Sequence, residues 1–296
     1  MRKRIIILFV FLLLFMSGLI FYEKKSKESF YKKNWGYHFL NIDTLHTEYG
    51  LTGKNVKVAL IDTGISDKAL NIDVVEGINV IDNSDDFTDD HGHGTHITGL
   101  LASKKIGVAP DIELYVAKAL NNTLRGEMTD IVKAVEWAIN KNVDIILMPF
   151  GTFEDSKELK MLIDKAVLDE DILVVSSVGN YGLKENIDIM YPAKYDNVIA
   201  VGALDKKNKV WKGTTLGEEL DYLLPGQYIN SYSTTGDSLI SSGTSMASAY
   251  MAGILALYVE KHRNVNINFN RSILSKDNKY RKIDGYEVMN PFKILE

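Results

Sequence analysis

The stretch VKVALIDTG, residues 56–64, decides the class of fold. It starts as an apolar run of strand length and ends in the turn Asp62-Thr63-Gly64. Similar apolar runs follow, and helix-like segments separate them; these runs are 114–119, 143–148, 172–176 and 198–201. Strands that are apolar throughout and alternate with helices predict a parallel sheet that is covered on both faces. The expected fold class is therefore α/β, with a parallel sheet flanked by helices on both faces.

The segments between these runs have the pattern of helices. Residues 129–140 place apolar side chains at helical spacing on one face, and residues 159–168 also indicate a helix. Residues 246–259 are apolar and rich in Ala and Gly, which predicts a buried helix.

The composition excludes several classes of protein. The chain has 296 residues, 46% hydrophobic and 25% charged, which suits one larger domain or two small ones. A net charge of -5 without a long basic run argues against a nucleic-acid partner. There is no cysteine, so disulfides, thiolate metal sites and a cysteine nucleophile are excluded. An extracellular bacterial protein can lack disulfides, so their absence does not fix the compartment.

The N-terminus predicts contact with a membrane. Three basic residues, 2–4, precede the uncharged apolar run 5–22, whose length is near the ~17–25 residues that span a bilayer. Because no clear small-residue cleavage site follows, we expect an uncleaved anchor, with a cleaved signal peptide as the alternative. Positive charge before the run favours a body outside the cell. The protein is thus expected at the cell membrane with an extracellular domain, or secreted.

This N-terminal pattern divides the chain into three parts. Residues 1–22 are the anchor or signal segment, and residues 23–33 are a polar, Lys-rich tether. Residues 34–296 form the folded domain.

Polar residues at the carboxyl ends of the predicted strands are candidates for chemistry, because ligands bind at that edge of open α/β sheets. Asp62 ends one strand, Asn180 follows another, and Ser245 precedes the predicted buried helix. Each has an ordinary alternative, as a turn residue or helix cap. A serine at a helix N-terminus also gains from the helix dipole, and an asparagine side chain can donate to an oxyanion.

The stretch DDHGHGTH, residues 89–96, holds three of the 6 histidines. Histidine and aspartate are zinc ligands, but the H-E-x-x-H pattern is absent. The other interpretations are a solvated loop and a catalytic histidine whose glycine neighbours leave room for a substrate chain. A serine near a histidine near an aspartate is the triad of acyl transfer.

Together these segments resemble the subtilisin family, whose triad has the same chain order of Asp, His and Ser. The segments are Asp-Thr-Gly at 62–64, His-Gly-Thr-His at 93–96, Gly-Asn at 179–180 and Gly-Thr-Ser-Met-Ala-Ser at 243–248. The resemblance runs from about Trp35 to the C-terminus and implies a subtilisin-like serine endopeptidase with a polypeptide substrate. It implies that Asp62 orients His93, the general base. It further implies that Ser245 attacks the substrate and that Asn180 stabilises the oxyanion.

The resemblance also implies where substrate binds. Met190, before Tyr-Pro, would help to floor the first pocket on the acyl side, and Met128 would lie at the fourth. Gly151 belongs to a segment whose backbone pairs with substrate in the family, although Pro149 departs from the family pattern. We therefore expect apolar side chains on the acyl side of the cleaved bond.

No cofactor and no metal site are expected. Many relatives bind calcium after the histidine helix, but the corresponding segment 103–106 is short, and Asn71 replaces an aspartate of that site. Calcium is possible elsewhere, because five acidic residues gather between 82 and 90.

Other functions stay open at this point. The protein is expected to process one secreted peptide or to degrade proteins generally. An inactive subtilisin-like scaffold that binds peptides is the alternative, and a metal-dependent hydrolase is a third hypothesis.

Overall fold

The computed structural model describes residues 34–263 and 281–295. Its main sheet has nine strands in the order β10-β11-β7-β6-β5-β4-β1-β3-β2. Neighbouring strands are parallel, except that β10 and β11 are antiparallel. The strands are β1 (Lys57–Asp62), β2 (Val74–Asn79), β3 (Glu113–Lys118), β4 (Ile145–Met148), β5 (Leu173–Ser177), β6 (Ile199–Leu204), β7 (Tyr222–Pro225), β10 (Arg281–Ile283) and β11 (Tyr286–Val288).

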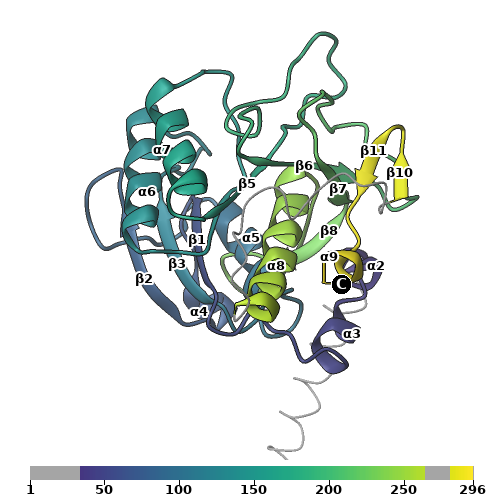
Figure 1. Ribbon diagram of the computed structural model, residues 1–296. Coiled ribbons are helices and arrows are strands. Elements are labelled where there is room, and N and C mark those ends of the chain that lie inside the picture. The colour runs from purple at the N-terminus through teal and green to yellow at the C-terminus, as the bar shows by residue number, and fades with distance from the viewer. Residues whose placement is uncertain (1–33, 264–280, 296) are drawn as a thin grey trace, which may run out of the picture.

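Helices cover both faces of this sheet (Figure 1). On one face, α6 (Met128–Asn140) and α7 (Lys157–Leu168) enclose one apolar core. On the other, α5 (His93–Ala102) and α8 (Thr244–His262) enclose a larger one. The predicted α/β class, with helices on both faces of a parallel sheet, is confirmed.

Shorter elements complete the fold. Strands β8 (Ile229–Tyr232) and β9 (Ser238–Ser241) form a separate antiparallel hairpin. The short helices are α2 (Trp35–Phe39), α3 (Ile42–Thr47), α4 (Asp67–Leu70) and α9 (Pro291–Leu295).

Strand β1 lies where the strand order reverses, between β3 and β4. The chain first builds β3 and β2 on one side of β1 and then β4 to β7 on the other. Open α/β sheets place their ligands at the carboxyl ends of strands at such a switch point. Asp62 is the last residue of β1, so it lies at that edge.

Helix α8 is the central helix of the larger core. Every residue from Thr244 to Val259 is buried, because the helix packs against α5 and against β4 to β7. It begins two residues before the predicted segment 246–259. Ser245 therefore lies inside its first turn and not before it.

The prediction for residues 5–22 lies outside the described residues, as does the tether 23–33. Among the residues that are described, none of the helices combines the length and apolarity needed to span a bilayer.

Candidate active site

The structure brings Asp62 and His93 into direct contact. His93 Nδ1 lies 2.8 Å from each of the two carboxylate oxygens of Asp62. The Asp62 side chain is fully buried, and that of His93 is 11% exposed. A ring N–H at Nδ1 donates to the carboxylate, so the other ring nitrogen, Nε2, is left as the basic atom.

A glycine lets these two residues approach. Gly94 follows His93, and a Cβ atom on it would lie 2.0 Å from the carbonyl oxygen of Gly64. No side chain fits there, because the first turn of α5 rests directly on the turn that follows β1. The glycine in the His-Gly-Thr-His segment is thus required by packing at the pair.

The pKa of His93 is raised above its ordinary value of 6.5. Burial opposes the charged imidazolium, but the Asp62 charge and hydrogen bond outweigh it, and Asp89 adds to them. The imidazolium that forms when His93 accepts a proton is therefore stabilised.

Ser245 lies on α8, which packs against α5. It is the second residue of the helix and is 7% exposed. Gly243 occupies the N-cap, so the interpretation of Ser245 as a cap is wrong. Among the described residues, no hydrogen bond joins the Ser245 hydroxyl to His93.

Asn180 is tied to the residue that precedes Ser245. Its Oδ1 accepts from the backbone N–H of Thr244 at 2.9 Å and from the Thr244 hydroxyl at 3.0 Å. Because Oδ1 accepts both hydrogen bonds, the orientation of the side-chain amide is fixed. Asn180 itself is exposed. The structure thus brings Asn180 to the N-terminus of α8.

The remaining histidines of the 89–96 stretch differ in environment. His91 is exposed, and its ring centroid lies 6.4 Å from that of His93. His96 is buried, and its Nε2 lies 3.2 Å from the carbonyl oxygen of Leu239. Burial and then the nearby His93 lower the pKa of His96 to about 4. His96 is therefore neutral at pH 7.

Two of the three predicted substrate residues are in contact. A Cβ on Gly151 would lie 2.7 Å from Met190 Cβ, and one on Gly179 would lie 2.8 Å from Met190 Sδ. Met190 thus fills the space between two glycine backbones and is 8% exposed. Met128 is half-buried at the start of α6 and packs against the core on that face of the sheet.

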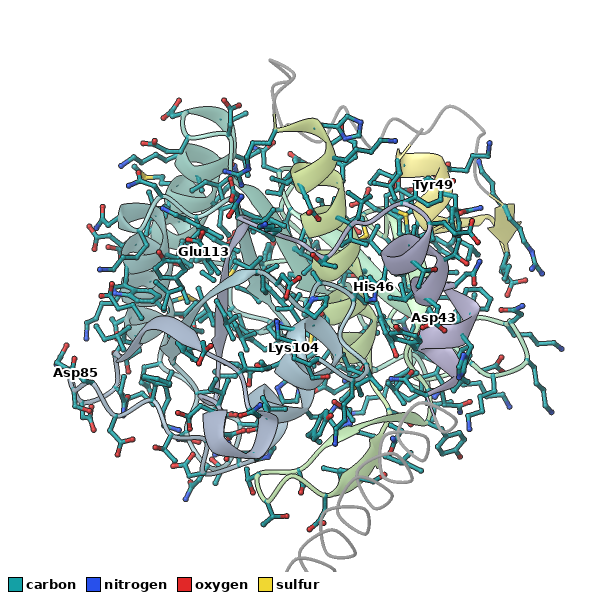
Figure 2. The ribbon with its side chains drawn as sticks, turned by 90° about the horizontal axis from the view of Figure 1, so that it is seen from below. Asp43, His46, Tyr49, Asp85, Lys104 and Glu113 are labelled. Atoms are coloured by element: carbon teal, nitrogen blue, oxygen red, sulfur yellow. The ribbon has the colours of Figure 1, made fainter. Side chains whose placement is uncertain are left out.

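The neighbourhood of Asn71 contains an ion pair. A cavity of about 420 Å³ there is lined by residues that include Lys54, Asn71, Asp73, Lys104, Asp111 and Glu113. Lys104 Nζ lies 2.6 Å from both Asp111 Oδ1 and the carbonyl oxygen of Pro110, so an ammonium group already holds these oxygens. Lys104 and Glu113 are seen on the same face, and Asp85, from the acidic stretch, lies at the margin of that view (Figure 2). Across residues 34–263 and 281–295, no three His, Cys, Asp or Glu side chains gather to hold a metal.

Two charged residues near the site have contacts that were not predicted from the sequence. Asp89 is buried and is hydrogen-bonded to Thr63, in the turn that follows β1, and to Thr95, in the helix that carries His93. Lys118 Nζ lies 2.7 Å from Thr63 O and 2.7 Å from Asp90 Oδ1. A signal existed for Lys118, since a lysine that ends an apolar buried strand must have partners.

Comparison with known proteins identifies the family. The profile of the Subtilase family matches residues 53–279. Subtilisin DY from Bacillus licheniformis is 37% identical over 249 residues, covering 81% of this chain and 89% of that protein. Subtilisin NAT from Bacillus subtilis subsp. natto is 37% identical over 235 residues, covering 77% of this chain and 61% of that protein. The chain belongs to the subtilase family.

A solved structure supports the same fold. The crystal structure of a cold adapted subtilisin-like serine proteinase matches with a TM-score of 0.73 at 23% identity, over 81% of this chain and 90% of that one. With the sequence relatives, the class of enzyme is that of a subtilisin-like serine endopeptidase. The predicted family and enzyme class are confirmed.

Proposed function

We propose that the protein hydrolyses peptide bonds through a triad of Asp62, His93 and Ser245. The observation that carries the proposal is the buried contact of His93 Nδ1 with both carboxylate oxygens of Asp62, at 2.8 Å. This contact fixes the tautomer and the orientation of the imidazole, so Nε2 is the atom that takes a proton.

The reaction then follows in two halves. Ser245 Oγ attacks the carbonyl carbon of the substrate while its proton passes to His93 Nε2. The resulting imidazolium gives that proton to the leaving amine, the C–N bond breaks, and an acyl-enzyme remains. Water, deprotonated by His93 Nε2, attacks the acyl carbon. The C–O bond to Ser245 then breaks, the imidazolium returns the proton to Ser245 Oγ, and a carboxylic acid is released. Hydroxyl–histidine contacts in free enzymes often tighten only with substrate bound.

Asn180 is proposed to stabilise the negative oxygen of the tetrahedral intermediate. Its Oδ1 is held by two donors from Thr244, so the side-chain N–H group is oriented without substrate. A donor fixed in advance costs no reorganisation during the reaction. Ser245 lies in the first turn of α8, and the dipole of that helix also favours negative charge there.

The proposed substrates are extended peptides with apolar side chains on the acyl side. Met190 would floor the first pocket beside Gly151, and Met128 would border the fourth. Burial of an apolar side chain against these thioethers contributes about 25 cal/mol per Å². The enzyme would either process one secreted peptide or degrade proteins in general.

The location and the metal requirement are also proposals. The run 5–22 supports a membrane anchor or a secretion signal for a catalytic domain of residues 34–296. The Lys104–Asp111 ion pair beside Asn71 supports a catalytic domain without calcium at that position.

A serine-directed fluorophosphonate probe tests the triad. The protein should be labelled, and Ser245→Ala should lose both the label and nearly all peptidase activity. His93→Ala should be about as severe, because triad residues act as a unit.

Ser156→Ala is the matched control. Ser156 also lies at a helix N-terminus, where its Oγ accepts from Leu159 N at 3.2 Å. Its loss should cost about 1 kcal/mol of stability and leave labelling intact. An unlabelled wild-type protein would indicate an inactive scaffold, and normal turnover by Ser245→Ala would contradict the mechanism.

A further inference from the structure

A second buried carboxylate lies beside the Asp62–His93 pair. Asp89 is 5% exposed and accepts five hydrogen bonds, although no lysine or arginine is among its donors. Oδ1 accepts from the Thr63 hydroxyl at 2.8 Å and from the backbone N–H groups of His91 and Gly92 at 3.0 and 2.8 Å. Oδ2 accepts from the backbone and the hydroxyl of Thr95 at 2.9 and 2.6 Å.

These donors keep Asp89 ionised. Burial opposes the charge, but the hydrogen bonds from Thr95, Gly92 and Thr63 outweigh it and hold the pKa of Asp89 below its ordinary value. The site therefore contains a fixed negative charge in addition to that of Asp62.

The Thr63 hydroxyl connects the segment that carries Asp62 to the segment that carries His93. Thr63 follows Asp62 in the chain, and its backbone N–H donates to Asp62 Oδ1 at 2.6 Å. Its hydroxyl accepts from the backbone N–H of Gly94, which follows His93, at 3.0 Å and donates to Asp89. One hydroxyl thus ties the residue after the aspartate to the residue after the histidine.

Asp89 also fixes the start of α5. The N-cap residue, Gly92, has no side chain to satisfy the first N–H groups of the helix. Asp89 supplies that acceptor to Thr95, the third residue of the helix, as a side-chain cap would. Hydrogen bonds to Asp89 therefore fix the first turn of α5, which carries His93.

We propose that Asp89 and Thr63 are positioning residues, which fix His93 against Asp62 and keep a second negative charge beside the imidazole. The proposal rests on the triad roles given above. Four titratable groups lie near the His93 imidazole, namely Asp62, Asp89, His91 and His96. Asp62 and Asp89 both favour the imidazolium, so loss of either charge lowers the pKa of His93.

The first test is the pair Thr63→Val and Thr63→Ser. Valine has nearly the shape of threonine but breaks the bonds to Asp89 and Gly94, whereas serine keeps the hydroxyl. We expect Thr63→Val to lower kcat by at least about tenfold with KM within about twofold, because two hydrogen bonds are lost and the loss of one is already on that scale. Thr63→Ser should retain most of the activity. A merely structural role would lower the melting temperature of Thr63→Val without changing kcat per folded, probe-labelled molecule.

The second test uses the pH profile. Asp89→Asn keeps the size of the side chain and removes the charge. The acidic midpoint of kcat/KM should move to lower pH, by on the order of half a unit, because the imidazolium loses a stabilising charge. Asp111→Asn is the control: it removes one charge at the amino end of β3, the opposite edge of the sheet, and should leave the midpoint in place.

Each outcome decides the proposal. An unchanged kcat in folded Thr63→Val, or an unchanged midpoint in folded Asp89→Asn, overturns it. If Asp89→Asn does not fold, the Thr63 pair decides alone. Absence of Ser245-dependent turnover in the unsubstituted protein would refute the proposed function and the positioning role together, whereas normal turnover in Thr63→Val refutes only the latter.

Discussion

Protonation of the buried His96 should make the protein sensitive to acid. Its pKa is lowered from 6.5 to about 4, first by burial and then by the nearby His93. In the unfolded chain the imidazole takes up a proton near pH 6.5, while in the folded protein it stays neutral down to about pH 4. Between these values the unfolded state binds more protons, so stability falls as the pH falls.

The size of this effect follows from the two pKa values. Integration of the linkage relation from pH 7 to pH 4.5 gives a loss of roughly 2 kcal/mol from His96 alone. His93 acts in the opposite direction: its raised pKa contributes stability below about pH 6.5 that is lost as the pH rises through its folded pKa. That contribution is present in all the variants compared and cancels between them.

The assay is urea unfolding followed by tryptophan fluorescence at pH 7 and pH 4.5. Every protein carries Ser245→Ala, which prevents self-digestion. His96→Gln should be less stable than its parent at pH 7 but should lose about 2 kcal/mol less on acidification. Ser231→Ala is the matched control, because the Ser231 hydroxyl donates to the carbonyl oxygen of His96 at 2.7 Å and does not titrate. Ser231→Ala should lower the free energy of unfolding by the same amount at both pH values. An equal acid-induced loss in His96→Gln and in the parent would refute the reasoning.

Three further predictions concern the site and its surroundings. Asn180→Asp keeps an acceptor for Thr244 but has no N–H to donate, so kcat should fall by roughly 10²–10³ with little change in KM, as measured for this role in subtilisin; an effect on KM alone would contradict it. Met190→Ala should open the space between Gly151 and Gly179 and raise kcat/KM for large apolar residues by about tenfold in a peptide library; a strict preference for basic residues would contradict the proposed pocket. Melting temperatures in calcium and in chelator should nearly coincide, and a shift above about 4 °C that Asn71→Ala removes would show that calcium binds there.

The parts of the fold that the sequence predicted are those with a local signal. Strands β1, β3, β4, β5 and β6 are buried on both faces. Each can therefore be recognised as a strand from a short run of apolar residues. Strand β2 lies at the sheet edge with a mixed burial pattern, and its residues do not stand out in the same way. Asp62, His93, Asn180 and Ser245 could be proposed from the sequence because strand ends and motifs mark them.

The support around Asp62 and His93 could not be predicted in the same way. Asp62 is the Cα partner of Lys118 in the parallel pairing of β1 with β3. That register arises from the packing of the whole sheet. In the sequence, Asp89 has no feature that distinguishes it from other aspartates of polar loops. Its contacts form only when the turn after β1 packs against α5. Contacts of this kind depend on segments that are far apart in the chain.

The burial of α8 has a consequence for the order in which the protein acquires activity. Ser245, the proposed nucleophile, belongs to the helix that fills the larger core. This helix comes last in the chain among the segments that carry the proposed triad. A chain still being synthesised, or one in which this helix has not docked, holds Asp62 and His93 without Ser245. Proteolytic activity should therefore appear only after α8 has docked against α5 and against β4 to β7, so incompletely folded copies should not digest one another.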